Sequence, residues 1–399
     1  MSLTDYRVSY DNSYQEVFNK VLVAKSIANM RYEPMLTFGG SVTRFTYDTS
    51  AVQVRTVSRG SPSTIDAITD STEVLTINLE KEAVFFISDG EVKQTGPLNP
   101  GEVIGGQIAI KVATDLDARV LAEVLNAYQT FDTGDLTTSS SSGTPITLSS
   151  TTVPQMVTRM PAKLKNVNQV LTGMAFVIDP YMAADLEQYL LGKQFDIVNS
   201  IWKNGYSGAI SMAEVYVSNN LTFTASLYMA TDPSDTNTVT INGIVFTALT
   251  TLVGGAGNFV RGGGADVARA NLVSLINAPD VTDATKEAFS AANVALIKAM
   301  KITAVNNNST DFMTITCQGT GRIVVSETLA DASDVWSLQT LHAFYGKKGA
   351  IDLVVQDLSS VDMRDTADRR GTNIFSSYLA GIRVFADGAK KMLDVKIVV

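Results

Sequence analysis

The chain has 399 residues, of which 45% are hydrophobic and 18% are charged, a composition that is typical of a folded globular protein and not of a disordered one. Its formal net charge of -9 and its pI near 4.8 exclude a broad basic surface that would wrap nucleic acid or bind an anionic membrane. We expect any contact with DNA to be loose or local.

The single cysteine, Cys317, excludes an intrachain disulfide and a multi-cysteine zinc cage. The surrounding run DFMTITCQG favours a small buried side chain over a reactive thiol. The N-terminal sequence MSLTDYRVSYDNS lacks the basic start and apolar core of a secretory signal, and no apolar run approaches the roughly 20 residues of a membrane helix. We therefore expect a soluble protein that is made in the cytosol and has no membrane partner.

The N-terminal part predicts a helix followed by long strands. Ser13 and Glu16 have the spacing of a capping box, and the apolar stripe after them predicts an amphipathic helix over residues 14–30. From Val42 the pattern has a period of two, through VTRFTY, VQVRTV and EVLTINLEKEAVFFIS, with the turn-rich RGSPSTIDAITDS in between. We expect a long hairpin between Val42 and Ser88 that cannot bury itself and must lie against something else.

The segment NPGEVIGGQIAIKVATDLDARVLAEVLNAYQ is the strongest helix prediction in the chain. Asn99 can cap it, Pro100 suits its first turn, and apolar residues recur every four positions from Ile104 to Tyr128. About 28 residues that rise about 1.5 Å each give a rod of about 40 Å. The following TTSSSSGTPITLSSTT indicates a flexible exposed loop, with an ordered lid as the alternative.

The next segment alternates strand and helix. GMAFVIDPYMAADLEQYLLGK predicts a strand, a helix that starts at Asp179-Pro180, and a stop near Gly192. The alternation continues to AISMAEVYVSNN.

Residues 222–335 have a self-contained local pattern. Asn242-Gly243 predicts a hairpin, and it is followed by a glycine-rich loop, two helical stretches (ADVARANLVSLIN and TKEAFSAANVALIKAM) and the strand-like DFMTITCQG and RIVVSE. We therefore expect this range to form an inserted α+β domain. Beyond it, GAIDLVVQ predicts a strand, and Asp387-Gly388 predicts a terminal hairpin.

No motif in the chain carries recognisable chemistry. A histidine pair for a metal is impossible, and a catalytic triad would have to use the single histidine, His342, which lacks a G-x-S-x-G elbow and stands before a hydrophobic strand. We expect His342 to be a packing or interface residue. The loop GGAGNFVRGGG lacks the closing Gly-Lys-Ser/Thr of a P-loop, and no carboxylates have the spacing of metal ligands. We thus expect no catalytic, cofactor-binding or metal-binding residues, no cofactor and no enzymatic activity.

The densest positive patch lies near the C-terminus and has acidic neighbours. It contains Arg364, Arg369 and Arg370, flanked by Asp362, Asp365 and Asp368. The alternating signs favour an ion-pair network within or between subunits over a DNA site.

The order of these elements resembles that of the major capsid proteins of tailed phages, the Hong Kong 97-like fold family. The matching stretches are TDSTEVLTINLEKEAVFFISDGEVKQ, PGEVIGGQIAIKVATDLDARVLAEVLNAY, AEVYVSNNL, GAIDLVVQ and YLAGIRVFADG. The resemblance covers nearly the whole chain except the insertion, which looks like the extra domains of some of these coats. It is specific as an ordered set and weak motif by motif. No long charged scaffolding helix precedes the arm, so we expect a separate scaffolding protein or a pro-segment absent from this chain.

The resemblance implies an α+β, Hong Kong 97-like fold with an inserted α+β domain. The implied parts are an N-terminal arm (1–35), an extended loop with peripheral-domain strands (36–95), a spine helix (96–135), the first part of an axial domain with its Ser/Thr-rich loop (136–221), the inserted domain (222–335) and a C-terminal axial and peripheral part (336–399).

The implied function is structural: copies assemble, as hexamers and pentamers, into an icosahedral shell around packaged double-stranded DNA. The implied partners are other copies, separate scaffolding, portal and decoration proteins, and loosely held DNA; the location is the virion capsid, after assembly in the host cytoplasm. An acidic coat suits this task, because a strongly basic lining would hold the genome through many phosphate contacts. The alternatives are a carbohydrate-binding or adhesive virion surface protein whose insertion carries the site, and a hydrolase that uses unrecognised carboxylates.

Overall fold

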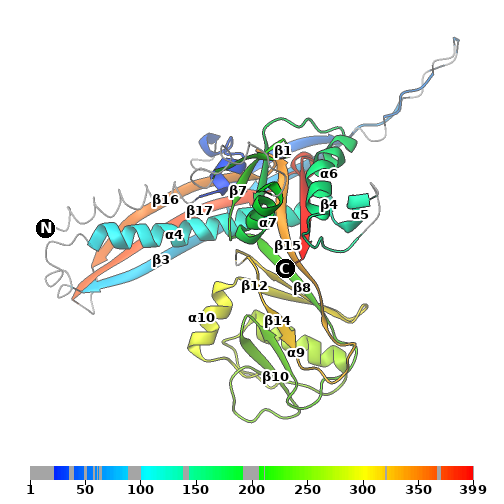
Figure 1. Cartoon of the computed structure of the whole chain (residues 1–399). Coiled ribbons are helices and arrows are strands. Elements are labelled where there is room, and N and C mark those ends of the chain that lie inside the picture. The colour runs from blue at the N-terminus through cyan, green and yellow to red at the C-terminus, as the bar shows by residue number, and fades with distance from the viewer. Residues whose placement is uncertain are drawn as a thin grey trace. The chain divides into compact units, whose positions relative to one another are not determined.

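The computed structural model describes residues 22–35, 40–48, 52–56, 59–60, 62, 65–88, 100–137, 143–191, 206–210, 212–319, 321–365 and 370–398. These residues form a mixture of helices and strands, in agreement with the predicted α+β class (Figure 1). They divide into two compact units. Unit 1 contains the described residues of 28–112 and 351–385, and unit 2 contains those of 22–27, 113–350 and 386–398.

Unit 1 is built mainly from strands. Its elements are η1 (Glu33–Met35), β1 (Ser41–Asp48), β2 (Thr69–Thr76), β3 (Leu79–Ser88), the first part of α4 (Pro100–Ala122), β16 (Asp352–Asp365) and β17 (Gly371–Arg383). Strands β1 and β2 pair antiparallel and form a sheet of their own, which confirms a hairpin in this part of the predicted range. Strand β3 pairs instead with β17, in a sheet of order β16-β17-β3. The alternating pattern identified β1 and the region of β2 and β3, but the predicted strand VQVRTV is wrong, since residues 52–56 form no strand and β2 begins at Thr69, within the predicted turn. The pattern also could not indicate that the partner of β3 lies nearly 300 positions later.

A small core anchors the hairpin within unit 1. Tyr32, Leu75, Val354 and Phe385 form a buried cluster, and Val42 and Ile77 pack against it. The rings of Tyr32 and Phe385 meet edge to face with centroids 6.3 Å apart. The base of the hairpin is therefore fixed by contacts that join residues far apart in sequence.

Helix α4 confirms the predicted long helix, but it ends earlier than the apolar pattern does. Its regular part has 23 residues, and the chain then tightens into the 3-10 turn η2 (Glu123–Asn126). Ala127 is extended, and the Tyr128 N–H donates to the Ala389 carbonyl, so the chain has already turned toward strand pairing. Tertiary hydrogen bonds thus override the four-residue periodicity in this last turn.

Unit 2 is organised around a nine-stranded sheet with the order β12-β13-β8-β15-β5-β7-β6, in which β18 pairs with β15 and with β4. These strands are β4 (Gln129–Phe131), β5 (Met174–Ile178), β6 (Tyr206–Ile210), β7 (Ala213–Val217), β8 (Thr222–Tyr228), β12 (Ile302–Asn307), β13 (Phe312–Cys317), β15 (Trp336–Lys347) and β18 (Met392–Val398). The helices outside residues 222–335 are α2 (Ala24–Ile27), the second part of α4, α5 (Thr133–Thr137), α6 (Thr152–Asn166), α7 (Pro180–Leu191) and α11 (Ala386–Ala389).

The predicted strand–helix–strand alternation is confirmed. Every residue of β5 is buried, and β5 runs parallel to β7, as a strand–helix–strand connection requires. Helix α7 begins at Pro180, and the Asp179 carboxylate accepts the N–H of Met182 at 2.9 Å. The predicted stop at Gly192 and residues 14–21 of the predicted helix over 14–30 lie outside the described residues. In the described part the helix is shorter than predicted: α2 ends at Ile27, because Asn29 is held in a bridge with Asp352.

Residues 222–335 also contain a four-stranded sheet of order β11-β10-β9-β14. Its strands are β9 (Thr238–Ile241), β10 (Ile244–Leu249), β11 (Asn258–Val260) and β14 (Val325–Glu327), and its helices are α9 (Ala265–Asn277) and α10 (Ala291–Ala299). Asn242 and Gly243 have φ values of 50° and 80°, so the predicted tight hairpin between β9 and β10 is confirmed. Helix α10 starts later than predicted, with Ser290 as its N-cap, because Lys286 is held in a bridge with Phe259. The independent folding of 222–335 stays a prediction.

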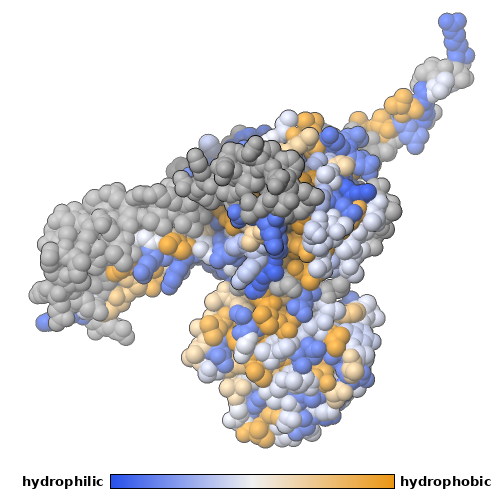
Figure 2. Space-filling view, viewed as in Figure 1, coloured by the Kyte–Doolittle hydropathy of each residue, from blue (hydrophilic) through white to orange (hydrophobic). Residues whose placement is uncertain are grey.

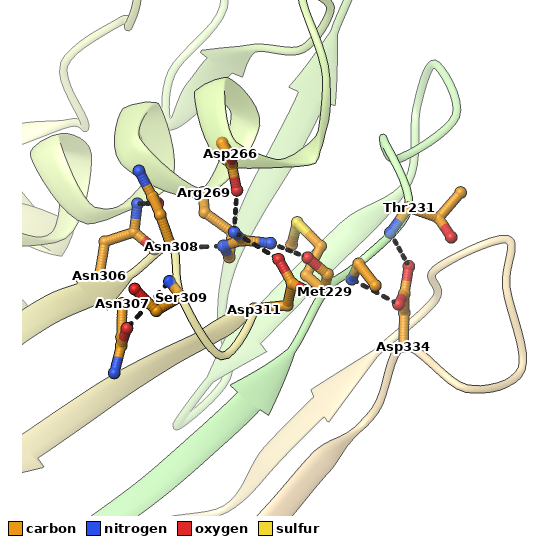
Figure 3. A network of polar contacts seen from close by, with 11 residues as sticks. Met229, Thr231, Asp266, Arg269, Asn306, Asn307, Asn308, Ser309, Asp311 and Asp334 are labelled. Carbon is orange, nitrogen blue, oxygen red and sulfur yellow. Dashed lines mark hydrogen bonds and ion pairs between the residues drawn. The ribbon is translucent and has the colours of Figure 1, made fainter.

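A buried arginine holds part of this segment together. Arg269 on α9 has no exposed surface, and its guanidinium bonds to Asp266, Asp311, Asn306 and the Met229 carbonyl (Figure 3). Removal of one partner of a buried charge strongly destabilises the folded protein, because the charge is then left without compensation. The network therefore joins α9, the β12–β13 turn and the end of β8.

The predicted terminal hairpin at Asp387-Gly388 is wrong. These residues lie in α11, and the strands on either side, β17 and β18, belong to different sheets. Gly388 approaches the Ala350 backbone so closely that a Cβ atom there would lie 2.2 Å from its carbonyl oxygen. Asp-Gly is a common turn signal, but here close packing requires the glycine and the short helix carries the chain from one sheet to the next.

Candidate assembly surface

The outer part of the β1–β2 hairpin exposes apolar side chains. Phe45 and Tyr47 share one face of β1 and are 66% and 70% exposed, and beyond the paired strands Val54 and Ile65 are 105% and 92% exposed. Figure 2 shows hydrophobic residues among hydrophilic ones along the segment that extends beyond β1. We call Phe45, Tyr47, Val54 and Ile65 the arm patch. Single exposed apolar residues are ordinary, but a row of them along one hairpin marks an interaction surface.

The distal segment is ordered by contacts between its two sides. Asp66 accepts the Gln53 N–H at 2.9 Å, and the Arg55 guanidinium lies 2.7 Å from its other oxygen. The backbone hydrogen bond from Gln53, and next the bond from Arg55, hold the pKa of Asp66 below its ordinary value. The two sides of the hairpin are thus joined well beyond the last paired residues of β1 and β2.

The three-stranded sheet offers a second surface in unit 1. Strands β16 and β17 have 14 and 13 residues, and β3 with 10 residues lies at one edge of the sheet. Val84 and Phe86 on β3 are 46% and 36% exposed. An edge strand with apolar side chains can add a strand or a loop from another chain.

Burial of the arm patch against another surface would supply most of the binding free energy at this site. Covering an exposed apolar side chain contributes roughly 1.5–3 kcal/mol, so its four members can contribute on the order of 6–12 kcal/mol. The described residues of unit 1 leave these four side chains between 66% and 105% exposed. The arrangement can therefore bind another protein surface, and its chemistry is apolar contact.

His342 lies in the nine-stranded sheet of unit 2 and is 5% exposed. Its Nδ1 faces both carboxylate oxygens of Asp394, at 2.8 and 2.9 Å, and its Nε2 lies 2.8 Å from the Thr224 hydroxyl. Since the carboxylate only accepts, Nδ1 carries a hydrogen that it donates to Asp394, and Nε2 shares a hydrogen bond with the Thr224 hydroxyl. The ring packs within the sheet, as the sequence predicts, and it also satisfies a buried carboxylate, which the sequence did not indicate.

The glycine-rich loop cradles an anion that belongs to the chain itself. The N–H groups of Gly254 and Gly255 and the side-chain amide of Asn258 all donate to the carboxylate of Glu287. Burial raises the pKa of Glu287, but the bond from Asn258 and the two backbone bonds outweigh it, and the net pKa is lowered. The predicted preference for a structural loop over a phosphate site therefore agrees with the contacts.

A buried carboxylate on α4 holds the chain before it in unit 2. Asp117 has no exposed surface and accepts the N–H groups of Val23 at 3.0 Å and Ala24 at 2.8 Å. Burial raises the pKa of Asp117 to about 6, and hydrogen bonds from Ala24, Val23 and Asn220 only partly oppose this rise. This contact between segments more than 90 positions apart was not apparent in the sequence.

The other sequence candidates have plain structural roles. Cys317 is fully buried and burial raises its pKa to about 12, which confirms a small unreactive side chain. Arg364 lies over the ring of Phe375, 5.1 Å from its centroid. Asp368 and Arg369 lie outside the described residues, so the predicted ion-pair network stays a prediction.

Two features are absent from the part of the chain that the structure describes. No group of three or more His, Cys, Asp or Glu residues is placed there to hold a metal ion. Among the same residues, no helix combines the length and the apolar character needed to cross a membrane.

No protein-family model matches the chain, and no curated protein matches its sequence. Solved structures are similar in fold. A structure from Mycobacterium phage Che8 is 13% identical over 93% of this chain and 90% of that chain, with a TM-score of 0.43. The capsid of cyanophage P-SCSP1u is 12% identical over 89% and 83% of the two chains, with a TM-score of 0.44. The mature capsid of bacteriophage PhiM1 is 12% identical over 90% and 82%, with a TM-score of 0.42. The likeness is one of fold, at low identity and at TM-scores below 0.5.

Proposed function

We propose that this chain is a capsid shell protein, many copies of which self-assemble into an icosahedral shell around packaged double-stranded DNA. The observation that carries the proposal is the arm patch, a row of side chains between 66% and 105% exposed on a hairpin whose base is anchored in its own core. Such a surface is suited to pack against another subunit.

The geometry suits contacts with slightly different neighbours. The base of the hairpin is fixed through Leu75, which is fully buried, while the Arg55–Asp66 pair joins the two sides of the distal part. A standard protein–protein contact buries about 1,600 Å², and an extended hairpin with an adjacent sheet edge is suited to provide such an area. The arm can thus pack on neighbours around a curved lattice.

The order of hairpin, long helix, α/β sheet and late strands also supports the proposal, because it is the order of elements in tailed-phage coats. In this proposal α4 is the spine, residues 222–335 are an added domain, and the partners are further copies in hexamers and pentamers, with scaffolding, portal and decoration proteins as separate chains. The net charge of -9 suits a shell that touches its DNA loosely. The protein would then reside in the virion capsid after assembly in the host cytoplasm.

The test combines negative-stain microscopy with sedimentation velocity of the purified chain. We expect closed particles from the native sequence and soluble subunits from the double variant Val54→Asn/Ile65→Asn. The matched control is Val253→Asn/Val324→Asn, which also removes two apolar side chains that are more than 70% exposed, and it should assemble normally.

Circular dichroism melting shows whether each variant is folded. Native chains that stay monomeric over a range of salt and protein concentration, with or without co-expressed scaffolding protein, would contradict the proposal. Glycan binding or substrate turnover by such monomers would instead support an adhesive protein or a hydrolase.

A further inference from the structure

A cavity of about 150 Å³ lies in unit 2 beside helix α6. It is lined by Phe131, Asp135, Arg159, Ala162, Lys163 and Asn166. The last four recur at spacings of three and four, so they share one face of α6. Phe131 is fully buried and Asp135 is 4% exposed, so a molecule in the cavity meets mainly the four helical residues. A single water needs roughly 10–15 Å³ of such space, so a molecule of several heavy atoms has room there.

The helical wall of the cavity is rich in hydrogen-bond donors that have few partners. Within the described part of the chain, Arg159 makes one long hydrogen bond, 3.4 Å from its Nη1 to the Asp135 carbonyl. A guanidinium has five N–H donors, so most of them stay available. Lys163 donates to the Thr130 carbonyl and to the Asp135 carboxylate, both at 2.5 Å, and keeps a third N–H. Because neither side chain can accept a hydrogen bond, the wall favours a ligand that supplies acceptors.

The ionised groups of the wall leave one positive charge unbalanced. Lys163 and Asp135 form an ion pair and neutralise each other. Arg159 forms no ion pair with a carboxylate among the described residues, and α6 contains no acidic residue. A singly charged anion would balance this charge, whereas a dianion would place an excess of negative charge close to Asp135.

We infer that this cavity binds a small organic molecule that carries one carboxylate group. The carboxylate meets the planar guanidinium of Arg159, which can donate two parallel hydrogen bonds to it. It lies away from the last turn at Asn166, because the carbonyl end of a helix disfavours negative charge. The short carbon chain of the ligand packs on the methyl group of Ala162. The inference does not depend on assembly into shells, because all the lining residues belong to one unit of one chain.

The test uses the full-length unassembled subunit and ligand-observed NMR titrations at neutral pH with four probes of similar size. Butyrate carries one negative charge, butyramide carries none, butylammonium is positive, and propyl phosphate is mostly doubly charged. We expect butyrate to bind about tenfold more tightly than butyramide, since the amide loses a charge-assisted hydrogen bond. Butylammonium should not bind, and propyl phosphate should bind more weakly than butyrate.

Three variants separate charge, shape and position. Arg159→Gln should bind butyrate about tenfold more weakly and lose the preference for butyrate over butyramide. Ala162→Leu keeps every charge but fills part of the cavity, and it should also bind butyrate at least tenfold more weakly. Lys165→Gln is the matched control, because it removes a positive charge from an exposed position of α6 outside the cavity, and it should bind like the native chain.

Circular dichroism melting shows whether each variant is folded, and the four-probe comparison on the native chain decides the matter even if a variant does not fold. Equal affinity for butyrate and butyramide, or no saturable binding of butyrate, would overturn the inference. Propyl phosphate that binds as tightly as butyrate would show that the site does not select a single charge. Unchanged butyrate affinity in a folded Arg159→Gln variant would also contradict the inference.

Discussion

Replacement of His342 by glutamine should weaken the subunit without preventing assembly. Glutamine keeps a polar end, but it cannot place polar atoms at the Nδ1 and Nε2 positions of a rigid ring at the same time. The Asp394 carboxylate, 3% exposed, would lose the partner that lies 2.8 Å from it, and the Thr224 hydroxyl would lose its hydrogen bond to Nε2.

The size of the effect follows from these two contacts. A hydrogen bond to a charged group contributes about 1.5–3 kcal/mol and a neutral one about 0.5–1.5 kcal/mol, so we expect a loss of roughly 2–4 kcal/mol. For a unit of this size the Tm falls by about 2–4 °C per kcal/mol, which gives a decrease of roughly 4–16 °C. Particles should still form below the new Tm, because the ring is buried within its own subunit.

The assay is a double-mutant cycle in thermal and urea unfolding of the subunit, with His342→Gln, Asp394→Asn and the double variant. We expect the two single losses to overlap, with a coupling of about 1.5 kcal/mol or more between the two sites. Additive losses within about 0.5 kcal/mol would refute the reasoning, because that result is typical of sites that do not interact. A soluble, folded His342→Gln subunit that forms no particles would give this residue an assembly role.

Three other predictions concern the arm, the inserted segment and the buried carboxylate on α4. Replacement of Arg59–Ser71 by a short Gly-Ser turn should leave the melting curve of the subunit unchanged and greatly reduce particle yield in sedimentation; normal yield would remove the arm from the interface. The excised segment 222–335 should show its own cooperative thermal transition, whereas an NMR spectrum of a disordered chain would show that its boundaries are wrong. Because Asp117 binds a proton more tightly in the folded state, its contribution to stability is full below about pH 3.8 and is lost as the pH rises to about 6. That loss is about 3 kcal/mol. The unfolding free energy of the native chain, relative to that of Asp117→Asn, should therefore rise by this amount when the pH is lowered from 7 to 3.5. A difference between the two proteins that does not change with pH would contradict this prediction.

Local patterns in the sequence were sufficient for elements that their own residues determine. The buried strand before Asp179, the helix start at Pro180 and the tight turn at Asn242-Gly243 depend on capping and turn geometry within a few residues, and all three are found. Helix α6 was not predicted, because Pro154 and Pro161 within it are signals that end helices. Tertiary contacts with unit 2 stabilise it in spite of them: its residues Met156, Met160 and Leu164 are buried.

Contacts between distant segments could not be predicted in the same way. The sequence shows one histidine and many aspartates, and nothing nearby selects Asp394 as its partner 52 positions away. The same holds for the pairing of β3 with β17 and for the cavity beside α6, whose wall joins residues from three elements. The arm patch is an intermediate case. Alternation predicted the strand β1, but only the structure shows which of its side chains are exposed.

The pairing of β8 with β15 has a consequence for shortened versions of this chain. Thr222 and Leu227 of β8 lie opposite His342 and Trp336 of β15, so removal of residues 222–335 would take away a neighbour from the middle of the nine-stranded sheet. The backbone N–H and C=O groups of β15 would then face solvent and could recruit strands from other molecules into aggregates. A deletion that is meant to produce a minimal subunit should therefore keep β8 and join it to β15 by a short turn, so that only the parts beyond it are removed.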